Sequence, residues 1–134
     1  MSTQAQALAA HQACSYSSRS KVIVIQNLHA IGSADLGPGI SVETIPALKL
    51  ALLCRVIAES EVRIAAIFVT PMTGVDLVHK RFVRRVRELA SAEGALLVWD
   101  ETILEHEDSP ESRLQFYGIK PDIVCAAATE RGPE

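Results

Sequence analysis

The amino-acid sequence predicts an α/β fold, with a mostly parallel sheet and flanking helices. Short, continuous runs of apolar and β-branched residues, such as 21–25 and 64–69, are typical of strands that are covered on both faces. Amphipathic segments of helical period separate these runs. This alternation is the pattern of βαβ units, whose crossovers are right-handed.

Each expected element follows from its local pattern. Residues 30–44 contain three glycines and a proline and predict a loop, with room for a short strand at 40–42. Residues 45–58 have apolar residues at helical spacing, and Pro46 is tolerated in a first turn. Gly94 occupies a C-terminal cap position after an amphipathic helix. The expected helices cover residues 4–14, 45–58 and 76–92, and the expected strands cover 22–25, 64–69, 95–99 and 122–126. Residues 104–113 predict a polar surface loop, 114–117 a short helix or turn, and 129–134 a frayed tail.

Composition narrows the classes of function. The chain has 134 residues and a formal net charge of −3, which suits one domain and argues against a nucleic-acid-binding protein. It has no apolar run near the ~18–20 residues that a membrane span needs, and its N-terminus lacks the pattern of a signal peptide. The three cysteines have no CxxC spacing, so a disulfide framework or a zinc site is not expected. We therefore expect a cytoplasmic protein without nucleic-acid or membrane partners.

The strongest local feature is the segment 96–101, LLVWDE, in which four apolar residues precede two carboxylates. A Walker B strand would need a phosphate-binding GxxxxGK[ST] loop, which the sequence does not contain. A receiver-like phosphate acceptor would need an acidic cluster near the end of the first strand, and this is also missing. The plain alternative is a solvated strand end. Ligands of parallel sheets bind beyond the carboxyl ends of the strands, which makes Asp100 a candidate site residue.

Four segments in the same order resemble the class III aminotransferases, which are pyridoxal-phosphate enzymes of fold type I and include the glutamate-1-semialdehyde aminomutases. These segments are IAAIFVTP at 64–71, FVRRVREL at 82–89, GALLVWDE at 94–101 and FYGIKPDIV at 116–124. The resemblance implies that residues 1–128 correspond to part of the large domain of such an enzyme, whose sheet is mostly parallel.

The resemblance also implies roles for individual residues. Asp100 matches the aspartate that pairs with the pyridine nitrogen of the cofactor and keeps the ring an electron sink. Ser2 and Thr3 match the phosphate loop at a helix N-terminus, a favourable place for an anion. His29 matches the histidine beside the ring-stacking aromatic residue. The position of the Schiff-base lysine is Ala128, so no catalytic residue is assigned.

The departure at Ala128 predicts a truncated, degenerate and catalytically incompetent aminotransferase, a pseudoenzyme, whose affinity for pyridoxal 5′-phosphate is weak or lost. The alternative is a non-catalytic interaction module that pairs with a full-length aminotransferase paralogue. An inactive remnant is a third option. An exposed edge of the strand at 122–126 would also favour self-association into a homo-oligomer.

The remaining titratable residues suggest no further site. His106 lies among acidic residues, where a solvated loop is favoured over a metal site. The basic side of the helix at 76–92 is expected to be solvated, and Cys125 is expected to be an inert core thiol. His11 and His79 are expected to be exposed helix residues.

Overall fold

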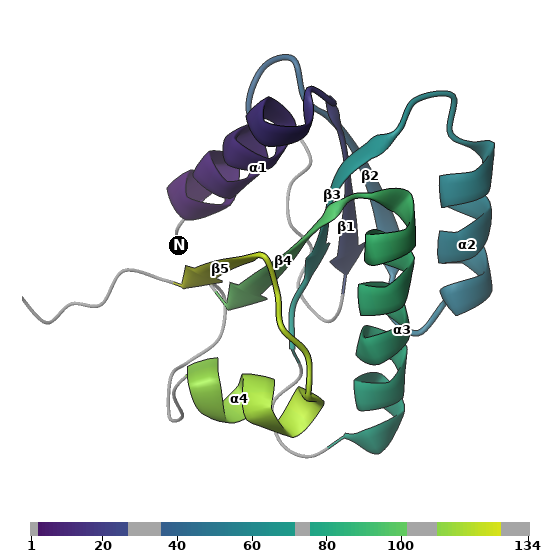
Figure 1. Cartoon of the computed structure of the whole chain (residues 1–134), viewed down its shortest axis with the longest axis vertical. Coiled ribbons are helices and arrows are strands. Elements are labelled where there is room, and N and C mark those ends of the chain that lie inside the picture. Colours follow the sequence, from purple (N-terminus) through teal and green to yellow (C-terminus); the bar gives the residue numbers. More distant parts are fainter. Residues whose placement is uncertain (1–2, 27–35, 72–75, 102–109, 127–134) are drawn as a thin grey trace, which may run out of the picture.

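The computed structural model describes residues 3–26, 36–71, 76–101 and 110–126, and it has the expected α/β architecture. Five parallel strands form one sheet in the order β2-β1-β3-β4-β5 (Figure 1). The elements are α1 (Thr3–Ser17), β1 (Lys21–Gln26), β2 (Ser41–Pro46), α2 (Leu50–Glu59), β3 (Ile64–Val69), α3 (Leu77–Glu93), β4 (Leu96–Glu101), α4 (Pro110–Tyr117) and β5 (Ile123–Ala126).

Helices cover both faces of the sheet, so the core has two layers. On one face, α2, α3 and α4 pack against inward-facing strand residues such as Ile67 and Trp99. On the other face, α1 packs through small residues, including Ala10 and Ala13, against Val24 and its neighbours. Burial on both faces explains why all six residues of β3 are apolar and buried.

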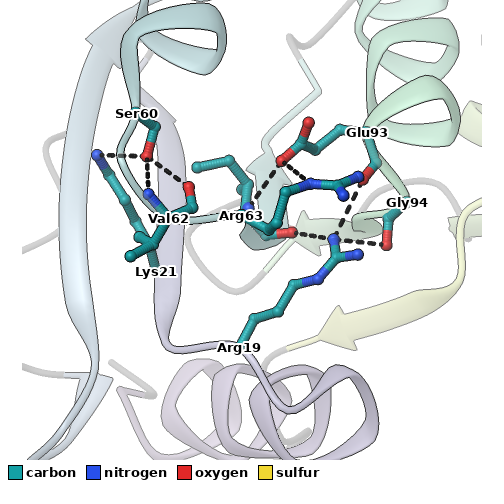
Figure 2. Close-up of polar contacts among 8 residues, drawn as sticks. Arg19, Lys21, Ser60, Val62, Arg63, Glu93 and Gly94 are labelled. Atoms are coloured by element: carbon teal, nitrogen blue, oxygen red, sulfur yellow. Dashed lines mark hydrogen bonds and ion pairs between the residues drawn. The ribbon is translucent and has the colours of Figure 1, made fainter.

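A polar cluster holds the amino ends of β1 and β3 to the end of α3 (Figure 2). The pairing of β1 with β3 shifts register between Lys21 and Val22, so the start of β3 departs from a regular ladder. At this irregular position, two side chains form hydrogen bonds with the backbone of Ile64. The Glu93 carboxylate accepts from its backbone N–H at 2.9 Å, and Arg19 Nη1 donates to its carbonyl at 2.9 Å.

The same arginine closes the C-terminus of α3. Arg19 Nη1 also donates to the carbonyls of Glu93 and Gly94, each at 3.1 Å. Gly94 is the C-cap of α3 with a left-handed φ of 77°, as the sequence predicted. The last carbonyls of a helix have no partner within the helix, so a cation at this point is favourable. Arg19 therefore links the α1–β1 connection to α3 and β3.

The predicted helix at 45–58 is wrong at its start. Residues up to Pro46 form β2, whose Ile45 and Pro46 pair with Ile25 and Gln26 of β1, and α2 begins only at Leu50. β2 is the edge strand of the described sheet, where a proline is tolerated because its missing N–H faces away from the partner strand. Burial of Ile45 against the sheet outweighs its helical spacing with the later apolar residues.

The predicted loop at 104–113 is wrong at its end. Helix α4 begins at Pro110, the first helical position, where the missing N–H of proline costs no hydrogen bond. Residues 104–109 lie outside the described residues, and so do residues 129–134, for which a frayed tail was predicted. The helix at 114–117 is confirmed as part of α4.

β5 is the last strand of the described sheet at the side opposite β2, as expected for the strand at 122–126. Its Val124 side chain is 47% exposed.

Among the helices of the described ranges, none is both long and apolar enough to cross a lipid bilayer.

Candidate cofactor site at the carboxyl edge of the sheet

Asp100 lies on β4 near the carboxyl edge of the sheet. In the β4–β5 ladder it is the partner of Cys125, so it lies beside the strand that leads toward residue 128. This neighbourhood confirms the placement that the sequence predicted. The alternative of a solvated strand end is wrong, because Asp100 and Glu101 are both fully buried. Strand β4 continues through both carboxylates, and the surrounding helices cover its two faces.

The first turns of α1 meet the sheet at this carboxylate. Gln6 Nε2 donates to Asp100 Oδ2 at 2.9 Å, and both side chains are buried. The Cys125 thiol lies 3.7 Å from the Ala5 carbonyl oxygen on the same helix. The start of α1 therefore lies at the carboxyl edge of β4 and β5 (Figure 1). The exposed N–H groups of a helix start favour an anionic group there.

The predicted site residues are only partly covered by the structure. Thr3 is the first residue of α1, as its predicted role at a helix N-terminus requires, but its side chain is not described. Ser2, His29 and Ala128 lie outside the described residues.

Cys125 is chemically quiet, as expected. Burial and, to a smaller extent, the negative charge of Asp100 together raise the pKa of its thiol to about 12. At neutral pH the sulfur therefore remains a protonated thiol and is a poor nucleophile.

Sequence reasoning did not identify Gln6. Its signal is a polar residue on the buried, alanine-rich side of α1, where Ala9, Ala10 and Ala13 pack against the sheet. A buried amide needs a partner, and on this face the partner is Asp100.

A second polar group lies on the opposite face of the sheet. Trp99 Nε1 donates to Glu101 Oε2 at 2.6 Å, and the Trp99 ring packs edge-on against Tyr117 with 5.1 Å between ring centroids. The Tyr117 hydroxyl lies 2.8 Å from His79 Nδ1. Because side chains alternate along β4, Asp100 and Glu101 serve different faces and do not form one acid–base pair.

The expectation that His79 is exposed is wrong, since its side chain is only 1% exposed. It lies three, four and seven residues before Phe82, Val83 and Val86, which places it on the buried face of α3. Burial lowers the pKa of His79, while the nearby Asp76 charge acts in the opposite direction. Its Nε2 atom is buried without a hydrogen-bond partner among the described residues.

The four lysines lie at other places in the fold. Lys21 begins β1 at the amino edge, 3.1 Å from a Glu43 carboxylate oxygen, and Lys120 precedes β5 at that same edge. Lys80 Nζ lies 4.9 Å from the centroid of the Phe116 ring, and Lys49 is the exposed N-cap of α2.

The structure also tests the predictions for His11 and for the basic side of α3. His11 is exposed, as expected. The basic side of α3 is only partly solvated, because Arg87 donates to the Lys120 carbonyl and pairs with Asp122 at 3.2 Å. His106 lies outside the described residues. In the part of the chain that the structure describes, no three metal-ligating side chains come together.

The chain is similar in sequence to curated aminomutases. Glutamate-1-semialdehyde 2,1-aminomutase of Desulforudis audaxviator is 38% identical over 65 residues, which are 46% of this chain and 15% of the relative. The enzyme of the same name from Desulfotalea psychrophila is 29% identical over 85 residues, 61% of this chain and 20% of the relative. The chain thus matches a fifth or less of the length of these relatives. No protein-family model matches the chain.

Solved structures agree over more of the chain. A β-phenylalanine aminotransferase from Variovorax paradoxus superposes with a TM-score of 0.72 and 25% identity, over 91% of this chain and 30% of that protein. An ω-transaminase from Sphaerobacter thermophilus gives a TM-score of 0.71 at 21% identity, over 92% of this chain and 35% of that protein, and supports the fold. The chain is therefore similar in sequence to aminomutases and in fold to aminotransferases, over part of the length of these proteins.

Proposed function

We propose that this chain binds pyridoxal 5′-phosphate without a covalent link and does not transfer amino groups by itself. The observation that carries the proposal is the buried Asp100 carboxylate, which lies at the carboxyl edge of the sheet beside the start of α1. A carboxylate and a helix start are the two features that a cationic ring nitrogen and a phosphate require.

The residues of this edge fit the cofactor in chemical type. Asp100 would accept a hydrogen bond from the protonated ring nitrogen, and the start of α1, with Ser2 and Thr3, would face the phosphate. His29 would lie near the ring, as the resemblance implies. When bound, the cofactor supplies an aromatic ring that withdraws electrons from a carbon next to nitrogen.

The proposed lack of transfer activity follows from Ala128. The family's linking lysine both attaches the cofactor and moves the proton, and alanine has no group that can do either. Lys21 and Lys120 lie at the amino edge of the sheet, away from Asp100. We place this function in the cytoplasm, because all three cysteines are free thiols, as is usual in a reducing compartment.

Equilibrium binding of pyridoxamine 5′-phosphate tests the proposal. This form carries the same ring and phosphate but no aldehyde, so it cannot label surface lysines. We expect saturable binding by the wild-type chain, measured by ligand fluorescence, and a loss of about tenfold in affinity for Asp100→Asn, the effect of weakening one charge-assisted hydrogen bond. Glu88→Gln removes an exposed carboxylate on α3 and serves as the matched control. Equal affinity in Asp100→Asn and the control would contradict the assigned role of Asp100.

The second candidate function is an interaction module that pairs with a full-length aminotransferase paralogue or with a second copy of this chain. The supporting observation is β5, the last strand of the described sheet, whose Val124 is 47% exposed. Light scattering after gel filtration, alone and with a full-length aminotransferase, distinguishes these partners. A complex that Val124→Lys disrupts would favour this function, and a monomer under both conditions would exclude it.

A further inference from the structure

The outer side of α3, which faces away from the sheet, carries a concentration of positive charge. Residues 77–93 contain five cationic and two anionic side chains, a net charge of +3 in a chain whose net charge is −3. Arg81, Arg84 and Arg85 are all exposed, and their spacing of three and four residues places them together on this side. Of these three, only Arg85 forms an ion pair among the described residues, with Glu88 at 2.6 Å.

The fold does not need this arrangement of charges. The opposite side of α3, with Phe82, Val83 and Val86, packs into the core and holds the helix against the sheet. Like charges three or four residues apart on a helix repel each other and lower its stability slightly. A local arrangement that costs stability and that packing does not explain is expected at a functional surface.

Two exposed apolar side chains lie on the same side of α3, about one turn before the arginines. Leu77 is 58% exposed and Val78 is 62% exposed. They precede Arg81 by four and three residues, so they are its neighbours on the helix surface. Arginine is enriched at protein–protein interfaces, where exposed apolar side chains are also removed from water.

We propose that this α3 surface, formed by Leu77, Val78, Arg81, Arg84 and Arg85, binds an acidic segment of another protein that also carries apolar side chains. Carboxylates of the segment would pair with the arginines and relieve their mutual repulsion. Its apolar side chains would cover Leu77 and Val78. The surface lies on the face of the sheet opposite α1 (Figure 1), whereas the Asp100 side chain faces α1, so this inference does not depend on the proposed function.

The charge and burial of the chain favour a protein partner over other polyanions. Outside residues 77–93 the chain has a net charge of −6, which would repel a long nucleic acid. A helix that binds a lipid surface inserts its apolar side into the membrane, but the apolar side of α3 is buried in the core. A short acidic segment can contact the arginines without approaching the rest of the chain.

Fluorescence anisotropy with labelled synthetic peptides tests the proposal on the full chain. The probe is a peptide of glutamates and serines with two leucines, and two matched peptides replace either the glutamates with glutamine or the leucines with serine. We expect the wild-type chain to bind the probe more tightly than either matched peptide. Arg81→Gln should weaken binding of the probe about fivefold, while the control Arg55→Gln, which removes an exposed arginine from α2, should change it by less than about twofold.

Urea unfolding without peptide separates a binding role of Arg81 from a structural role. Arg81→Gln removes a like-charge repulsion, and Arg81 has no hydrogen bond or ion pair among the described residues that the substitution would break. The urea midpoint should therefore stay the same or rise slightly. A clear fall in the midpoint would show that Arg81 supports the fold and would overturn its assignment to a binding surface.

Each outcome of the peptide experiment decides the proposal. Binding of the probe that Arg81→Gln weakens and Arg55→Gln does not weaken supports the α3 surface. Absence of binding, equal weakening by the two variants, or equal binding of the glutamine peptide overturns it. Equal binding of the peptide without leucine overturns the stated chemistry of the partner. Tighter binding to phosphatidylserine vesicles or to duplex DNA than to the probe overturns the choice of a protein partner.

Discussion

Arg19 offers a direct test of how the amino edge of the sheet is held together. Its Nη1 atom donates to three carbonyls, of Ile64, Glu93 and Gly94, at 2.9 to 3.1 Å (Figure 2). Arg19→Met keeps most of the aliphatic stem and removes the donor and the charge. Helix α3 then loses a C-terminal cation, and the irregular start of β3 loses a donor.

The magnitude follows from the number and kind of these bonds. A hydrogen bond with a charged partner contributes roughly 1.5–3 kcal/mol, and three acceptors that share one nitrogen do not contribute additively. We therefore expect Arg19→Met to lower the free energy of unfolding by about 2–3 kcal/mol, or the Tm by roughly 5–10 °C for a chain of this size.

Urea and thermal unfolding, followed by circular dichroism, measure this loss. Arg84→Met is the matched control, because Arg84 is an exposed arginine on the solvent side of α3. It should change the free energy of unfolding by no more than about 0.5 kcal/mol. Equal stability of the two variants would refute the assignment of Arg19 as the link between α1, β3 and α3.

Two further predictions concern stability. Gly94→Ala should destabilise the chain more than Gly39→Ala, although both glycines have a positive φ. A Cβ at Gly94 would lie 3.2 Å from Arg19 Nη2, whereas a Cβ at Gly39 would have no atom within 4 Å. Equal losses of stability in urea unfolding would argue against this contact. Burial lowers the pKa of His79, so the unfolded chain binds this proton more readily and stability should fall as pH drops through about 6.5. His79→Gln should therefore make the urea midpoint less dependent on pH between pH 5 and 7.5, and an unchanged slope would refute this reasoning.

The sequence predicts the central strands well for a physical reason. β1 and β3 are buried on both faces, so almost every position in them must be apolar, and the pattern is visible locally. β2 lies at an edge and buries fully only Ile45, so its few apolar residues also match a helical period. The location of Pro46 in a strand depends on its pairing partner in β1, which local spacing does not reveal.

Part of the candidate site could likewise be predicted from local sequence patterns, and part depends on the tertiary structure. The place of Asp100 follows from the carboxyl-end rule for parallel sheets and from the family resemblance. The partner of Asp100 does not, because Gln6 reaches it only through the way α1 lies across β4 and β5. His79 was missed for a different reason, since the spacing that places it on the buried side of α3 is present in the sequence but its polar character suggested exposure.

We propose above that the chain binds pyridoxal 5′-phosphate without the lysine that would link it. The most direct measurement is intact-mass and peptide mass spectrometry after the chain is saturated with pyridoxal 5′-phosphate, reduced with borohydride and compared with a dialysed sample. We expect reversible binding that dialysis removes, with no stoichiometric label on Lys21, Lys49, Lys80 or Lys120. A full, site-specific label on one of these lysines that survives dialysis and disappears in Asp100→Asn would contradict it.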